Sequence, residues 1–160
     1  MTAHDLSMHL MRERDLLELM LFKLETQQTL LATGRTRWVG HTAGEIERVA
    51  EAMKAAALER DTFVTAVAAE WGAADVTTLS ALVDAAPTDG WREVLQAHQA
   101  AMIALADEIG ELKEVNEMRL RTALRVTQET IAGLGEPTGE YNATGFIPGV
   151  GGSRLLDTKA

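Results

Sequence analysis

The chain has 160 residues, which suits one domain, and 46% of them are apolar while only 4% are aromatic. Its 24 acidic and 15 basic residues give a net charge of −9, which argues against nucleic-acid binding, because basic side chains supply most of that affinity. The absence of cysteine excludes disulfides and thiolate catalysis. No signal-peptide core and no apolar run of membrane-spanning length are present. We therefore expect a cytoplasmic protein without membrane insertion.

The first half of the chain predicts two long helices. The first begins behind a cap at Asp5 or Ser7 and runs to about Thr33, with leucines every seven residues and Gly34 as its stop. The second runs over residues 37–71, and its start is placed between residue 37 and Gly44, because Gly40 and Gly44 both lower helix propensity. Its apolar seam alternates by four and three residues and is interrupted only at Arg60: Val39, Ala43, Ile46, Ala50, Met53, Ala57, Val64, Val67 and Trp71.

The second half predicts one short helix, one long helix and a tail. Residues 75–86 form the short helix, capped by Asp75 or Thr77, and a Pro-Thr-Asp-Gly turn follows it. A third long helix covers residues 91–134, with Gly110 as a possible bend. Six of the 13 glycines lie in residues 135–160, which we expect to form a flexible tail behind a bundle domain of residues 1–134. The predicted fold is an elongated, antiparallel, all-α bundle of three long helices and one short helix.

The sequence holds no pattern typical of a catalytic or metal site. No Glu-x-x-His pair occurs, so a di-iron bundle is disfavoured. His9 and Glu13, four residues apart, are expected to form a solvated surface pair, and His98 is expected to be a hydrogen-bonded core residue. We predict neither a cofactor nor an enzymatic activity.

The late part of the third helix is the candidate binding surface. Asn116 is a polar residue on an otherwise apolar seam, and two interpretations are equally favoured. It either sets the register of the core, or it marks the point where the intramolecular core ends and a partner begins. In the second case the following seam residues contact a partner helix, as anchors at helical spacing do. The candidate site is therefore Asn116, Leu120, Leu124, Ile131 and Leu134.

Several stretches, taken in order, resemble flagellar export chaperones of the FlgN family, particularly actinobacterial ones. The similarity covers nearly the whole chain: residues 14–25, 27–31, 33–38, 45–49, 91–95, the helix from His98 to Asn116, 141–145 and 153–157. The family often has a second asparagine three residues after the first, whereas this chain has Arg119 at that position. The closing segment resembles the family's Tyr-x-x-x-Gly pattern through Tyr141 and Gly145.

The resemblance implies a chaperone that holds hook–filament junction proteins, the flagellar hook-associated proteins, in the cytoplasm before type III secretion. It also implies docking at the export apparatus, for which Tyr141 is a candidate contact. The alternative is a structural or regulatory helical bundle, such as a homodimer, whose seams are satisfied by self-association and which has no role in secretion.

Overall fold

The computed structural model describes residues 1–135, which form helices and no β-strand. The elements are α1 (Ala3–Ala32), a 3₁₀ turn η1 (Thr36–Trp38), α2 (Val39–Glu70), α3 (Leu79–Asp84) and α4 (Asp89–Gly135). The predicted all-α bundle with three long helices and one short helix is confirmed. The chain divides into one unit at Met1–Thr122 and a second that begins at Ala123. The predicted tail, residues 135–160, lies outside the described residues except for Gly135.

The start of α1 is a capping box whose N-cap, Thr2, lies three residues earlier than the first cap predicted. The Thr2 hydroxyl accepts a hydrogen bond from the Asp5 backbone N–H at 3.3 Å, and the Asp5 carboxylate accepts one from the Thr2 backbone N–H at 2.8 Å. The bond from the Thr2 backbone N–H, together with one that the Thr2 hydroxyl donates to the same carboxylate at 2.9 Å, holds the pKa of Asp5 below its usual value. The predicted cap at Asp5 or Ser7 is wrong because Asp5 is the reciprocal acid of the box.

Two glycines end the helices of the first half, as the sequence predicts. Gly34 and Gly72 have φ values of +69° and +74°, in the left-handed region that glycine adopts without steric cost. After each glycine the chain turns back and donates a backbone hydrogen bond to the helix it leaves, Arg35 to Leu30 at 2.9 Å and Ala73 to Ala68 at 2.8 Å.

The remaining helix boundaries differ from the prediction by a few residues. α2 begins at Val39 and includes both glycines of its first turns, so the start is not near Gly44. α3 has only six residues and is capped by Thr78, whose hydroxyl accepts from the backbone N–H of Ala81, and not by Asp75 or Thr77. α4 starts at Asp89 and continues through Gly110 without interruption.

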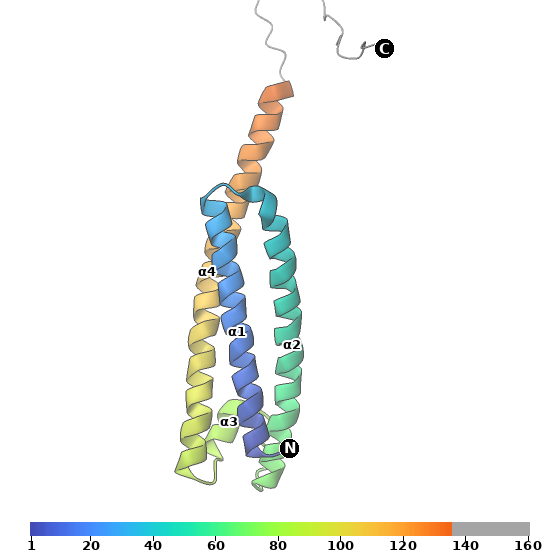
Figure 1. Ribbon diagram of the computed structural model, residues 1–160. Coiled ribbons are helices and arrows are strands. Elements are labelled where there is room, and N and C mark those ends of the chain that lie inside the picture. The colour runs from blue at the N-terminus through green and yellow to red at the C-terminus, as the bar shows by residue number, and fades with distance from the viewer. Residues whose placement is uncertain (136–160) are drawn as a thin grey trace, which may run out of the picture. The chain divides into compact units, whose positions relative to one another are not determined.

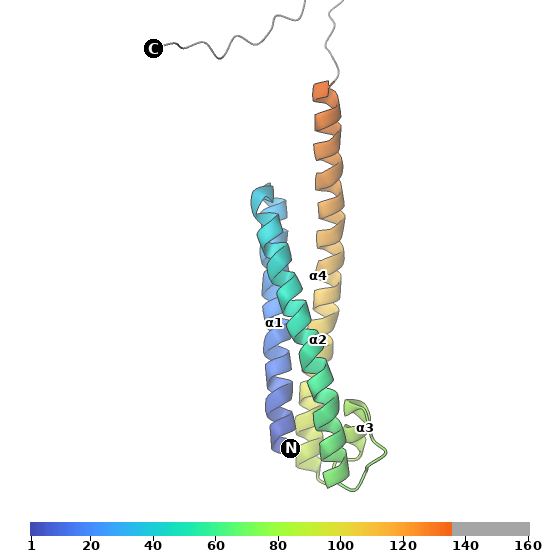
Figure 2. The same cartoon turned by 90° about the vertical axis from the view of Figure 1, so that its right-hand side faces the viewer.

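Within Met1–Thr122, α1 and α2 run antiparallel and side by side, and the first part of α4 runs along them (Figures 1 and 2). The short α3 lies at the end of this unit that holds the N-terminus (Figure 2). It packs there against α2 and shares one buried cluster with α1 and α4. Over the rest of their length, the three long helices have no fourth helix from the described residues packed against them.

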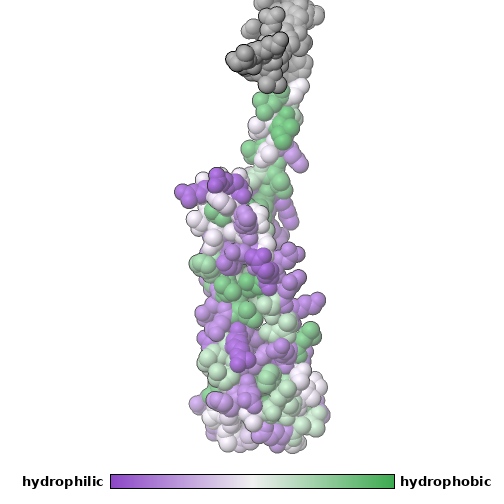
Figure 3. Space-filling model, turned by 45° about the vertical axis from the view of Figure 1, so that its right-hand side comes forward, coloured by the Kyte–Doolittle hydropathy of each residue, from purple (hydrophilic) through white to green (hydrophobic). Residues whose placement is uncertain are grey.

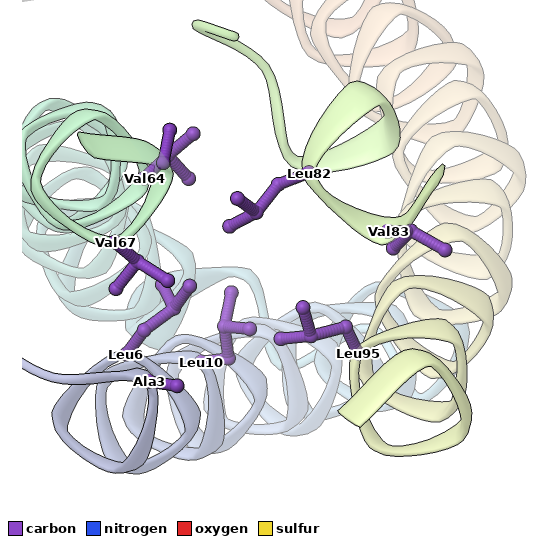
Figure 4. Close-up of a cluster of buried hydrophobic side chains, with 9 residues drawn as sticks. Ala3, Leu6, Leu10, Val64, Val67, Leu82, Val83 and Leu95 are labelled. Carbon is purple, nitrogen blue, oxygen red and sulfur yellow. The ribbon is translucent and has the colours of Figure 1, made fainter. Parts of the chain in front are cut away.

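The basal core is the hydrophobic cluster at the α3 end (Figure 4). Leu6 and Leu10 of α1 meet Val67 of α2, Leu82 of α3 and Leu95 of α4, and all five side chains have no exposed surface. Full burial of each such side chain contributes roughly 1.5–3 kcal/mol. The cluster therefore joins four helices into one unit: Ala3, Leu6, Leu10, Val64, Val67, Ala68, Leu82, Val83 and Leu95.

A buried polar layer follows the basal core along α1, and it corrects one prediction. His9 and Glu13 are buried, so the solvated surface pair is wrong. His9 Nε2 donates to the Ala56 carbonyl at 2.9 Å, and its ring stacks on Phe63 with centroids 4.9 Å apart. Arg60 Nη1 donates to both Glu13 carboxylate oxygens at 3.0 and 3.2 Å. The interruption of the α2 seam at Arg60 thus supplies the cation for a buried acid.

The predicted α2 seam is right near the basal core and wrong toward the α2 start. Val64 and Val67 are buried as predicted, but Ala43 and Ala50 are exposed. Their place in the core is taken by Thr42, Val49 and Ala56, which repeat every seven residues. Ala43 and Ala50 consequently lie on a surface that no other described helix covers closely, whereas Ile46 packs against the cluster of Met20, Leu24 and Val49.

The Glu13–Arg60 pair gives a test of the buried polar layer. Burial raises the pKa of Glu13, and the nearby Arg60 charge offsets this only in part. An Arg60→Ala variant leaves a buried carboxylate without its cation, and we expect it to lower the free energy of unfolding by about 2 kcal/mol. Urea unfolding followed by circular dichroism measures the loss. A Glu13→Leu, Arg60→Met double variant is the control and should recover most of it.

Candidate helix-binding surfaces

An apolar groove lies between α1, α2 and α4 within Met1–Thr122. Its volume is about 720 Å³, and most of its lining area comes from carbon atoms. Figure 3 shows hydrophobic surface midway along the bundle, among polar side chains. The groove is lined by three α1 residues, seven α2 residues and five α4 residues: Met20, Leu24, Gln27, Gly40, Ala43, Gly44, Ile46, Glu47, Ala50, Met53, Ile109, Lys113, Asn116, Glu117 and Leu120.

The side chain of Asn116 is buried at this groove with half of its amide unpaired. The residue is 1% exposed, and Nδ2 donates to the Leu24 carbonyl at 2.9 Å and to Gln27 Oε1 at 3.2 Å. Because the Leu24 carbonyl can only accept, the amide nitrogen has to face it. Asn116 Oδ1 is then left buried without a hydrogen-bond partner among the described residues. A buried acceptor without a donor costs free energy, so the packing of α4 against α1 carries a local penalty at this atom.

Two glycines of α2 lie on the same groove with open space above them. A Cβ atom built on Gly40 or on Gly44 meets no heavy atom within 4 Å outside its own helix. Each glycine lowers local helix stability by roughly 0.5–1 kcal/mol relative to alanine. No close approach within the described part of the chain uses the space that they leave. With Ala43 and Ala50, they form a shallow, smooth wall.

The charged side chains of the groove lie at its edges and carry both signs. Glu47 on α2 and Lys113 on α4 line it without an ion pair within residues 1–135, whereas Glu117 pairs with Arg121 at 3.5 Å. Neither Glu47 nor Lys113 is buried. The apolar floor is therefore open to a side chain or helix that brings no charge of its own.

The last turns of α4, residues 123–135, form a second apolar surface. Leu124, Ile131 and Leu134 are 62%, 64% and 83% exposed. Their spacing of seven and three residues places them on one face of the helix. The only charges in this segment, Arg125 and Glu129, approach each other at 3.8 Å. Such a row of large exposed side chains is typical of a protein-binding surface.

The structure thus distributes the predicted site residues over two surfaces. Asn116 and Leu120 line the groove, with Asn116 buried and Leu120 half-buried. Leu124, Ile131 and Leu134 are the exposed residues of the α4 end. Tyr141 lies outside the described residues.

Sequence reasoning missed the α1 and α2 walls of the groove. The available signal was the Gly-x-x-x-Gly spacing of Gly40 and Gly44, which was interpreted only as weak helix propensity.

The histidines and acids of the described residues form no group of three or more that could hold a metal ion. His98 is a core residue, as predicted, with its Nε2 atom 3.0 Å from the Ser7 hydroxyl oxygen. Burial, and secondarily the Arg14 charge, lower the pKa of His98 and favour its neutral form.

Comparison with known proteins identifies the family. A family model described as FlgN protein matches residues 1–147. The chain belongs to the FlgN family. The match confirms the resemblance seen in the sequence and makes this chain a member of a family of flagellar export chaperones. Searches of curated proteins and of solved structures found no match. Within residues 1–135 of this FlgN-family chain, no helix combines the length and hydrophobicity needed to cross a bilayer.

The open space above the groove glycines predicts that replacing one of them with alanine stabilises the protein. A Gly44→Ala substitution should raise the free energy of unfolding by about 0.5–1 kcal/mol, because the added methyl group meets nothing and the helix propensity improves. Thermal unfolding followed by circular dichroism measures the change. Gly34→Ala is the matched control and should destabilise, since its φ is positive. A Gly44→Ala variant less stable than wild type would reveal a close packing contact at this position.

Proposed function

We propose that this FlgN-family chaperone binds hook–filament junction proteins in the cytoplasm before their export. The client segment is a helical terminus that would otherwise self-associate. Its apolar stripe contacts the late α4 residues Leu120, Leu124, Ile131 and Leu134, with Asn116 at the start of the surface. The observation that carries the proposal is the exposure of Leu124, Ile131 and Leu134 on one helical face.

The energetics of this face support a specific interaction. Burying each large side chain contributes roughly 1.5–3 kcal/mol before the cost of ordering the two partners. The three exposed anchors, together with the half-buried Leu120, are sufficient for micromolar or tighter binding if the client segment is already helical. The Thr127 and Thr130 hydroxyls donate to the carbonyls of Ala123 and Val126 in their own helix, at 2.9 and 2.8 Å. The face therefore presents few polar groups that a client would have to satisfy.

Docking at the export apparatus is a separate part of the proposal. Tyr141 is its candidate contact because a single aromatic residue in a glycine-rich segment is a common form of short docking motif. A role of this kind would leave client binding independent of Tyr141.

The sharpest test compares two acidic substitutions on the same helix. Leu124→Asp places a charge in the centre of the proposed face and should weaken client binding at least tenfold while keeping the helical content. Val126→Asp, also at an exposed apolar residue but on another side of the helix, is the matched control and should bind as wild type does. Calorimetry with a purified hook–filament junction protein from the same genome provides the dissociation constants.

Equal weakening by both variants would indicate a non-specific effect of negative charge on an already acidic protein. Wild-type affinity of Leu124→Asp would exclude the late α4 face as the client site.

A further inference from the structure

The groove of Met1–Thr122 is an incomplete packing site. Two independent features share it: an apolar floor and two glycines with open space above them. A pocket for water or a small ion would carry polar walls, whereas these walls are mostly aliphatic. Glycine and alanine along a helix allow the backbone of another helix to approach closely. The features together fit the apolar face of an amphipathic helix.

The dimensions of the groove limit the length of that helix. On α2 the lining from Gly40 to Met53 covers thirteen residue steps, and on α4 the lining from Ile109 to Leu120 covers eleven. At 1.5 Å per residue, the two walls are roughly 20 Å and 17 Å long, so the shorter wall has about three helical turns. The occupant therefore needs about three turns with large apolar side chains on one face.

The end of α4 has these properties. From Leu124 to Leu134 it covers ten residue steps, equal to about three turns, and its three large apolar side chains are exposed. Arg125 and Glu129 lie on the other side of the helix and face each other, so entry into the groove would bury no unpaired charge.

We propose that the groove is filled by the end of α4 from a second copy of this chain. The occupant has to come from another chain because α4 is itself one wall of the groove. Two copies exchange the segment reciprocally, so that each supplies one groove and one helix, which closes the assembly with two-fold symmetry. The inference rests on the proposed function in one respect: the segment that fills the groove carries the client face. Self-association and client binding are then mutually exclusive.

The test uses the full chain and two kinds of variant. Gly44→Leu fills the groove without a clash at its Cβ, and Leu124→Asp makes the inserting helix polar. Sedimentation velocity from about 1 to about 100 µM covers moderate affinities. Wild type should show a concentration-dependent monomer–dimer equilibrium, and each variant should weaken dimerisation at least tenfold. A mixture of the two variants should recover a heterodimer, because Gly44→Leu retains an intact helix and Leu124→Asp retains an intact groove.

A second groove-filling variant is the control for a folding defect in Gly44→Leu. Ala50→Leu fills the same groove at an exposed alanine and should reproduce the effect of Gly44→Leu while both variants keep the wild-type circular dichroism spectrum. A wild type that stays monomeric throughout, or a dimer that tolerates both groove-filling variants, would overturn the inference.

Client titrations separate this inference from the proposed function. Gly44→Leu should still bind client through Leu124, Ile131 and Leu134, which lie outside the groove, whereas Leu124→Asp should lose both activities. If Leu124→Asp abolishes client binding and the chain never dimerises, the proposed function stands and the self-association is rejected. If Gly44→Leu abolishes client binding in a monomeric chain, the groove is the binding site of the client helix instead.

Discussion

The packing of the first 122 residues depends on how far α3 reaches. The three long helices have more apolar surface than they bury against one another within the described residues. The six residues of α3 act as a fourth packing element only at one end. There the core closes completely around Leu6, Leu10 and Leu95. Farther along, Met20, Leu24 and Val49 form a smaller cluster that is backed by half-buried side chains. The apolar groove is the direct consequence of that missing wall.

Polar residues divide the closed part of the bundle from the open part. His9 and Glu13 of α1 find their partners on α2, so they fix the alignment of that hairpin. Asn116 ties α4 to the α1 backbone at the Leu24 carbonyl, farther along the bundle. Both interpretations of Asn116 that the sequence left open agree with its position. It is a buried, hydrogen-bonded core residue, and it lies next to apolar surface that is not covered.

The helices could be predicted from the sequence because their signals are local. The glycines at 34 and 72 and the leucine repeat of α1 place the turns and the buried face without knowledge of the rest of the chain. The groove could not be predicted, because the α2 seam is rotated by one residue toward Thr42, Val49 and Ala56, and only packing against α1 decides that rotation. The buried state of Glu13 depends in the same way on Arg60, 47 positions later. Exposure of Leu124 and Ile131 depends on whether another described helix lies beside the end of α4, which the local sequence of that segment does not encode.

Membership of the FlgN family makes an unsatisfied apolar helix face meaningful, because an export chaperone has to offer its client a surface that its own fold leaves free. The most direct test of this account is amide hydrogen exchange of the full chain with and without a hook–filament junction protein. Our account predicts that the client slows exchange in residues 120–134 of α4, while the basal core around Leu6 and Leu95 exchanges as slowly in either state. Protection confined to other helices, or no change along α4, would contradict it.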